Sequence, residues 1–184
     1  MLKKPLKIVL IGGPATGKTT VLEALKGENF HCFEEISREV TLKSQKKGIE
    51  QLFLSEPLLF SEMLLEGREK QYLEAEKSLN RFVFFDRGIP DVKAYLDYFK
   101  LNYPKTFLKK CQFYSYDYIF HFSPWEKIHM NDNERYESFE ESIIIDQYIK
   151  KTYTDLGYKI INVPFGKLEE RCQFILNFLS SNYE

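Results

Sequence analysis

The chain has 184 residues, a formal net charge of −1, 43% hydrophobic residues and 29% charged residues. This length and balance suit a single α/β domain over residues 1–184, and the small charge argues against bulk attraction to nucleic acid or an anionic membrane. The three cysteines are far apart and form no CxxC pair, so neither a disulfide framework nor a zinc site is expected. No apolar stretch is long enough to span a membrane, which predicts a cytoplasmic protein.

Short apolar runs alternate with helical patterns along the chain. The runs cover residues 8–11, 82–85, 118–122 and 160–163, with a weaker fifth run at 30–33. Helical spacing is seen in four sets: Val21, Leu22 and Leu25; Leu58, Leu65, Tyr72 and Leu79 within about 56–79; Ile145, Ile149, Tyr153 and Leu156; and Leu168, Cys172, Ile175 and Leu179. Continuous apolar runs are typical of strands buried on both faces. The alternation predicts a three-layer α/β fold with a parallel sheet of about five strands and helices on both faces.

The first apolar run leads into a glycine-rich turn with the pattern G-x-x-x-x-G-K-[ST], the P-loop. The predicted nucleotide-binding residues are Gly12, Gly13, Pro14, Ala15, Thr16, Gly17, Lys18, Thr19 and Thr20. Glycines let successive N–H groups face phosphates, and the following helix adds its positive N-terminus. Lys18 is expected to reach the β- and γ-phosphates of ATP or GTP, and Thr19 to offer its hydroxyl to Mg²⁺.

The second strong apolar run, 82–85, ends in Asp86 and Arg87. In P-loop proteins a strand-terminal Asp holds Mg²⁺ or a metal-bound water, so Asp86 is the second predicted metal ligand. The alternative is that Asp86 caps the next helix. An Asp-Arg pair here resembles nucleoside and nucleotide kinases, and the chain has neither the D-x-x-G switch nor the N-K-x-D guanine reader of regulatory GTPases.

Glu35 and Arg38 follow the weak run and are three residues apart, which predicts that both lie on one helical face near the strand ends. There Glu35 would orient or deprotonate an acceptor hydroxyl group, or the two residues would form only a solvated ion pair. Arg68 and Tyr72 lie four apart on the long helix, so they face either a substrate cavity or the surface.

The polar segment 123–138 follows a strand and precedes a helix, which is typical of a lid. Arg135 is its only arginine and is the first candidate to stabilise charge on a transferred phosphoryl group, with Lys127 as the second. The alternative for Arg135 is a surface ion pair. Trp125 is either a hydrophobic anchor or a stacking partner for a base.

The loop after the last strand contains Pro164 and Phe165, which we expect beside the nucleotide base, although ordinary turn chemistry explains these residues equally well.

The segments GGPATGKTT, EEISRE, FFDRG and PWEKIHMNDNERYE, in this order and spacing, resemble the ATPase-like domain that forms the ribosylnicotinamide kinase half of bifunctional NMN adenylyltransferases. The same domain occurs in stand-alone predicted ATPases. The resemblance covers nearly the whole chain and implies a P-loop NTPase of the nucleoside-kinase-like branch, with the Asp86 strand beside the P-loop strand. It implies Glu35 as the substrate-side carboxylate and Arg135 as a lid arginine, although Asp132-Asn133-Glu134-Arg135 departs from the family's frequent D-G-x-R pattern.

Taken together, these features predict phosphoryl transfer from ATP or GTP with Mg²⁺ to a small hydroxyl-bearing, nucleoside-like acceptor. Lys18, Arg135 and Arg87 would stabilise charge, while Glu35, Arg38, Arg68, Asp86 and Arg87 would surround the acceptor. The alternative is a nucleotide-dependent switch that binds a protein or lipid partner. The acceptor, the choice between ATP and GTP, and the oligomeric state, including a homo-oligomer, stay open.

Overall fold

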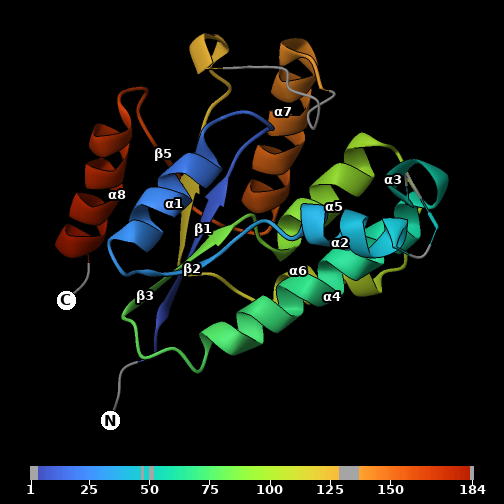
Figure 1. The fold of residues 1–184 in the computed structure, drawn as a ribbon, viewed down its shortest axis with the longest axis horizontal. Coiled ribbons are helices and arrows are strands. Elements are labelled where there is room, and N and C mark those ends of the chain that lie inside the picture. The colour runs from blue at the N-terminus through green and yellow to red at the C-terminus, as the bar shows by residue number, and fades with distance from the viewer. Residues whose placement is uncertain (1–3, 47, 50–51, 129–136, 183–184) are drawn as a thin grey trace.

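The computed structural model describes residues 4–46, 48–49, 52–128 and 137–182 (Figure 1). The strands are β1 (Leu6–Ile11), β2 (His31–Phe33), β3 (Phe82–Asp86), β4 (Tyr118–His121) and β5 (Ile160–Asn162). The helices are α1 (Lys18–Gly27), α2 (Ser37–Gln45), α3 (Leu52–Ser55), α4 (Pro57–Ala75), α5 (Ile89–Tyr98), α6 (Thr106–Phe113), α7 (Phe139–Asp155) and α8 (Leu168–Asn182), with a 3₁₀ turn at Glu126–Ile128.

The five strands form one parallel sheet in the order β2-β3-β1-β4-β5. β1 is central, with β3 on one side and β4 on the other, so Asp86 ends the strand next to the P-loop strand. This confirms the predicted parallel sheet and the predicted position of the Asp86 strand. Because the strands are parallel, their carboxyl ends all meet at one edge of the sheet, where ligands bind in open α/β folds.

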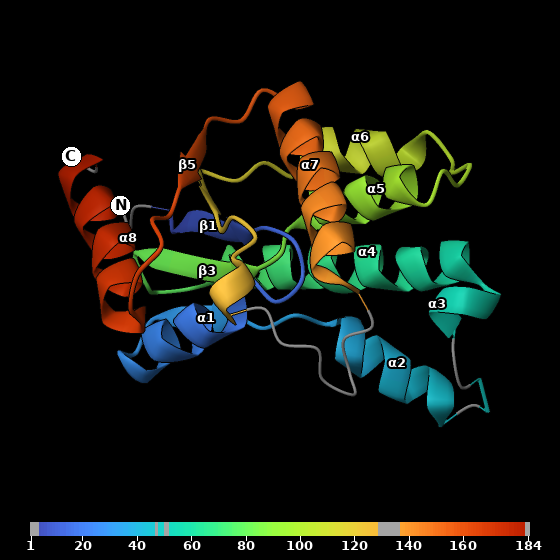
Figure 2. The ribbon, with the colours of Figure 1, turned by 90° about the horizontal axis from the view of Figure 1, so that it is seen from above.

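Helices cover both faces of the sheet, as Figure 2 shows from above. The side chains of β1 alternate between two cores. Ile8 and Leu10 pack with α1 and α8, while Val9 and Ile11 pack with the layer made by α4, α5, α6 and α7. All four side chains are fully buried, which explains the unbroken apolar run that marked this strand in the sequence.

Two differences from the sequence-based expectation concern helices. No range was predicted for α3, α5 or α6. In α5, Pro90 stands in the first turn, where its missing N–H costs nothing. The long helix ends at Ala75, and Leu79 is 91% exposed in the turn before β3, so the expectation that Leu79 continues the apolar face is wrong.

Among the described residues, no helix is both long enough and apolar enough to cross a membrane. The three cysteines are free thiols, and burial raises the pKa of each, to about 12 for Cys32 and Cys111. Thiols with such pKa values are poor nucleophiles at neutral pH.

Candidate active site

The P-loop runs from the end of β1 into α1 at the carboxyl edge of the sheet. Its backbone enters the left-handed region at Ala15 and at Gly17, with φ of 56° and 82°, and Gly12 has φ of 144°. A Cβ atom at Gly12 would overlap the carbonyl oxygen of Phe122, well inside van der Waals contact. Glycine is therefore required at position 12 by close packing as well as by conformation.

Lys18 folds back over the loop. Its Nζ donates to the carbonyl oxygens of Gly12 and Gly13 at 3.0 and 2.7 Å and to Thr16 Oγ1 at 3.0 Å. Burial, followed by the charge of Arg87, lowers the pKa of Lys18 to about 8, against the opposing effect of Asp86. A buried ammonium group this close to a ring of backbone groups is suited to bind an incoming anion.

Thr19 and Asp86 meet next to the lysine. Thr19 Oγ1 donates to Asp86 Oδ2 at 2.6 Å, and the carboxyl group of Asp86 is almost fully buried. Burial raises the pKa of Asp86, partly offset by Lys18. A hydroxyl oxygen and a carboxylate oxygen in contact at a strand end are the hard donors that Mg²⁺ prefers, so these two residues fit a magnesium site. No cluster of three or more His, Cys, Asp or Glu residues within the described ranges offers a different metal site.

Glu35 lies between two arginines. Arg68 Nη2 donates to Glu35 Oε1 at 3.1 Å, and Arg87 Nε pairs with Glu35 Oε2 at 2.7 Å. Burial by itself would raise the pKa of Glu35, but the charges of Arg68 and Arg87 and a hydrogen bond from the Ser37 N–H lower it overall. Glu35 is therefore an ionised carboxylate at neutral pH, and its side chain remains 21% exposed.

Arg87 is held in a strained conformation by several partners. Its φ is 71°, a region that non-glycine residues rarely adopt. Nη1 donates to the carbonyl oxygen of Gly12 and to Asp91 Oδ1, both at 3.3 Å. Asp91 is fully buried and accepts further hydrogen bonds from the Gly88 N–H at 2.8 Å and the Tyr153 hydroxyl at 2.7 Å. The guanidinium group of Arg87 thus joins the P-loop to Glu35.

The structure corrects the prediction that Glu35 and Arg38 share one helical face. Helix α2 begins at Ser37, so Glu35 precedes the helix, and the two residues do not share a helical face. Arg38 is exposed in the first turn of α2. Arg68, for which the sequence left a surface position open, is buried at 4% exposure and also donates to the Gly88 carbonyl oxygen at 2.9 Å.

The segment 123–138, which the sequence predicts to be a lid, is described only in part. Arg135 and Asp132 lie outside the described residues, and Lys127 is exposed on the 3₁₀ turn. The Trp125 ring packs on Phe165, with centroids 5.0 Å apart and an angle of 31° between the rings. Trp125 and the loop that contains Pro164 and Phe165 are therefore neighbours in space, as a shared role beside a base would require.

Arg171 braces the far side of the P-loop. Its Nη2 donates to the Thr16 carbonyl oxygen at 2.8 Å, and its guanidinium lies 4.7 Å from the centre of the Phe122 ring. The Nε atom is buried without a hydrogen-bond partner, and burial lowers the pKa of this arginine. A Cβ atom at Gly17 would lie 2.6 Å from Arg171 Nη1, so position 17 also has little free space.

Among the buried polar residues that sequence reasoning missed are four ionisable ones in and around the site: Asp91, His121, Asp146 and Arg171. Asp146 and Arg171 each stand among buried apolar residues of an otherwise amphipathic helix, in α7 and α8. A charged residue on an apolar helix face is a usable signal, because burial of an unpaired charge is costly and implies a partner. The identity of that partner is not contained in the helical pattern.

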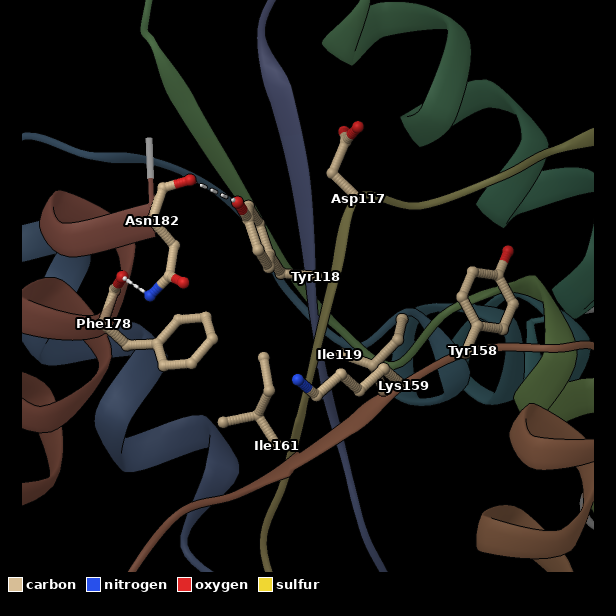
Figure 3. Close-up of a pocket in the computed structure, with 8 residues that line it drawn as sticks. All are labelled: Asp117, Tyr118, Ile119, Tyr158, Lys159, Ile161, Phe178 and Asn182. Carbon is tan, nitrogen blue, oxygen red and sulfur yellow. Dashed lines mark hydrogen bonds between the residues drawn. The ribbon is translucent and has the colours of Figure 1, made fainter. Parts of the chain in front are cut away.

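A cavity of about 270 Å³ lies away from this site (Figure 3). Tyr118 from β4, Ile161 from β5, and Phe178 and Asn182 from the last turns of α8 contribute to its wall. The P-loop follows the carboxyl end of β1, whereas Tyr118 pairs with Ile8 near the amino end of the sheet. The lining includes none of the predicted site residues.

Comparison with known proteins identifies both a family and a fold. The family model described as "AAA domain" matches residues 7–171. A comparison with curated proteins finds no match. Among solved structures, the deoxyadenosine kinase from M. mycoides aligns at 17% identity with a TM-score of 0.67, covering 96% of this chain and 100% of that one. The thymidylate kinase from Candida albicans aligns at 16% identity with a TM-score of 0.67, covering 97% and 92%.

A NadR protein in complex with NR aligns at 18% identity with a TM-score of 0.71. The alignment covers 96% of this chain and 50% of NadR, so the chain spans about half the length of that protein. These findings confirm the predicted three-layer α/β fold, which the chain shares with these solved structures. At such low identities the likeness concerns the fold.

Proposed function

We propose that this chain, which belongs to the AAA domain family, transfers the γ-phosphoryl group of ATP or GTP to the hydroxyl group of a small, nucleoside-like acceptor. The observation that carries the proposal is the Arg68–Glu35–Arg87 cluster, which joins an acceptor-side carboxylate to the P-loop through one guanidinium group. A nucleotide-binding site without an acceptor would not need a carboxylate ordered in this way.

At the donor end, Lys18 would release the loop carbonyl groups and bind phosphate oxygens. The ammonium group already lies within 3.0 Å of three oxygens of the loop, so the exchange needs only a side-chain movement. Binding of a phosphate would also favour the charged form of Lys18, whose pKa is lowered to about 8. Arg87, beside it, would spread positive charge over the transferred group.

Thr19 and Asp86 would hold Mg²⁺. When bound there, the ion would neutralise negative charge on the β- and γ-phosphate oxygens. In the protein itself, Asp86 would need to be ionised, and Lys18 favours that form.

At the acceptor end, Glu35 would accept a hydrogen bond from the acceptor hydroxyl group and orient it for in-line attack. A carboxylate with a lowered pKa is a weak base at neutral pH, so orientation is favoured over early proton abstraction. This suits phosphoryl transfer, where positioning and electrostatics supply most of the acceleration.

The charges of the site favour an acceptor without a phosphate group. Among the described residues that contact one another here, Arg68 and Arg87 are both matched by carboxylates, Glu35 and Asp91. A phosphorylated acceptor would bring about two negative charges to a cluster with no unmatched guanidinium. An uncharged nucleoside-like acceptor does not need an unmatched guanidinium group.

The test is release of ADP from Mg·ATP, or GDP from Mg·GTP, in the presence of a panel of nucleosides, nucleotides and vitamins. The proposal predicts that at least one hydroxyl compound raises turnover above the rate with water alone. Glu35→Gln should abolish that increase while nucleotide affinity stays within about twofold. The matched control is Glu34→Gln, which changes the exposed neighbour that pairs with Lys26. If no acceptor raises turnover, the kinase proposal fails and the switch interpretation takes its place.

A further inference from the structure

One peptide group of the P-loop contacts three charged side chains. It joins Gly12 to Gly13. Its carbonyl oxygen accepts hydrogen bonds from Lys18 Nζ at 3.0 Å and from Arg87 Nη1 at 3.3 Å. Its N–H, on Gly13, donates to Asp146 Oδ1 at 3.1 Å. The peptide is trans, so its C=O and N–H point in opposite directions. Whatever holds the N–H therefore also aims the carbonyl group.

The Asp146 carboxylate is in turn held by His121. It lies on α7, which runs beside the P-loop in Figures 1 and 2, and it is buried at 6% exposure. His121, the last residue of β4, is fully buried and places Nε2 2.8 and 3.0 Å from the two Asp146 carboxylate oxygens. Because a carboxylate only accepts hydrogen bonds, His121 Nε2 must carry the proton. His121 Nδ1 lies 2.9 Å from Asn162 Oδ1, at the end of β5.

A second contact from α7 supports the same loop. Ser142 Oγ donates to the Pro14 carbonyl oxygen at 3.3 Å. A Cβ atom at Gly13 would lie 2.6 Å from the Ser142 carbonyl oxygen, so α7 packs directly on the P-loop backbone. The loop cannot rotate about the Gly12–Gly13 peptide without losing these contacts.

We propose that Asp146, oriented by His121, is a positioning residue for phosphoryl transfer: it sets the plane of the Gly12–Gly13 peptide and thereby the resting positions of Lys18 and Arg87. This inference rests on the proposed function, because it assumes that the P-loop binds a polyphosphate. Asp146 would act without contacting the donor or the acceptor. Its effect passes through one backbone peptide, and the N–H that it occupies is withdrawn from phosphate binding.

Two variants separate the effect of the hydrogen-bond acceptor at position 146 from the effect of its negative charge. Asp146→Asn keeps an oxygen that can accept from the Gly13 N–H, provided that His121 shifts its proton to Nδ1, which then faces Asn162 Oδ1. Asp146→Ala removes the acceptor altogether. The matched control is Asp155→Ala on the same helix, which breaks only an exposed pair with Lys151.

The experiment measures dissociation constants for Mg·ATP and for inorganic tripolyphosphate with Mg²⁺, by calorimetry, well below the unfolding temperature of each variant. Asp146→Ala should weaken binding of both probes by about tenfold or more, since one charge-assisted hydrogen bond is lost. Asp146→Asn should recover most of the affinity, to within about threefold of wild type. Asp155→Ala should leave both constants unchanged.

Several results would overturn the proposal. Unchanged affinity in Asp146→Ala, with a lowered unfolding temperature, would make Asp146 a structural residue. Loss of ATP affinity without loss of tripolyphosphate affinity would place its effect at the base and not at the phosphate cradle. Failure of the wild-type protein to bind either probe would instead refute the proposed function, so the two failures can be told apart.

A measurement on the wild-type protein covers the case in which Asp146→Ala does not fold. The Gly13 amide proton should be protected from hydrogen exchange without nucleotide, and the protection should persist when Mg·ATP is added. An amide that exchanges as fast as those of exposed loops would contradict the proposal without any variant.

Discussion

Replacement of Arg68 by methionine tests whether the Arg68–Glu35–Arg87 cluster is organised as described. Arg68 is 4% exposed and donates to Glu35 and to the Gly88 carbonyl oxygen. Methionine fills a similar volume but leaves the Glu35 carboxylate with Arg87 and the Ser37 N–H alone. Removal of one partner of a buried ion pair costs about 3–5 kcal/mol. Glu35 keeps 21% exposure, so we expect the lower end, about 3 kcal/mol.

The assay is urea unfolding followed by circular dichroism at neutral pH. With an m-value of about 2 kcal/mol per molar urea, a loss of about 3 kcal/mol lowers the midpoint by about 1.5 M. A domain with about 5–15 kcal/mol of stability remains folded after this loss. The control is Lys70→Met, an exposed residue on the same helix α4, which should change the midpoint by less than about 0.3 M.

The loss of stability in Arg68→Met should also depend on pH, in a direction that the pKa of Glu35 sets. The folded-state pKa of Glu35 is lowered below its ordinary value of 4.5, so ionisation of Glu35 stabilises the folded protein above that pH. This contribution is lost as the pH falls through the folded-state pKa. Without Arg68 the lowering is smaller, so the gap between wild type and variant should narrow at acidic pH. A variant with the wild-type midpoint at pH 7, or a gap that widens on acidification, would refute the reasoning.

Three further outcomes are expected. Lys18→Ala should weaken Mg·ATP binding by more than about tenfold in calorimetry, and unchanged affinity would contradict the phosphate-binding role of the loop. Gly12→Ala should abolish nucleotide binding, because the new Cβ atom would overlap the Phe122 carbonyl oxygen; a variant that binds normally would show that the loop has space to move. Tyr153→Phe should lower the free energy of unfolding by about 1–3 kcal/mol in urea titrations, because the buried Asp91 carboxylate loses one hydrogen bond, and a change below about 0.5 kcal/mol would contradict that contact.

The sequence alone was sufficient to predict those features that depend on residues close together along the chain. The P-loop is recognisable because its glycines, Lys18 and Thr19 act within eight consecutive residues between a strand and a helix. Continuous apolar runs predict the buried strands, since both faces of a central parallel strand are covered. Asp86 could be placed because the carboxyl ends of all strands in a parallel sheet lie at the same edge.

Only the tertiary structure could decide the partners that lie far apart in sequence. Glu35 pairs with Arg68 and Arg87 and not with Arg38, because helix α2 begins after Glu35 and the chain returns twice through α4 and β3. Asp146 reaches the Gly13 N–H across 133 residues because α7 packs on the P-loop. Helical and strand periodicities report which face of an element is buried, but not what it is buried against. The amino-acid sequence therefore determined the buried strands and the phosphate cradle, while long-range packing decided how the cradle is held and which charges surround Glu35.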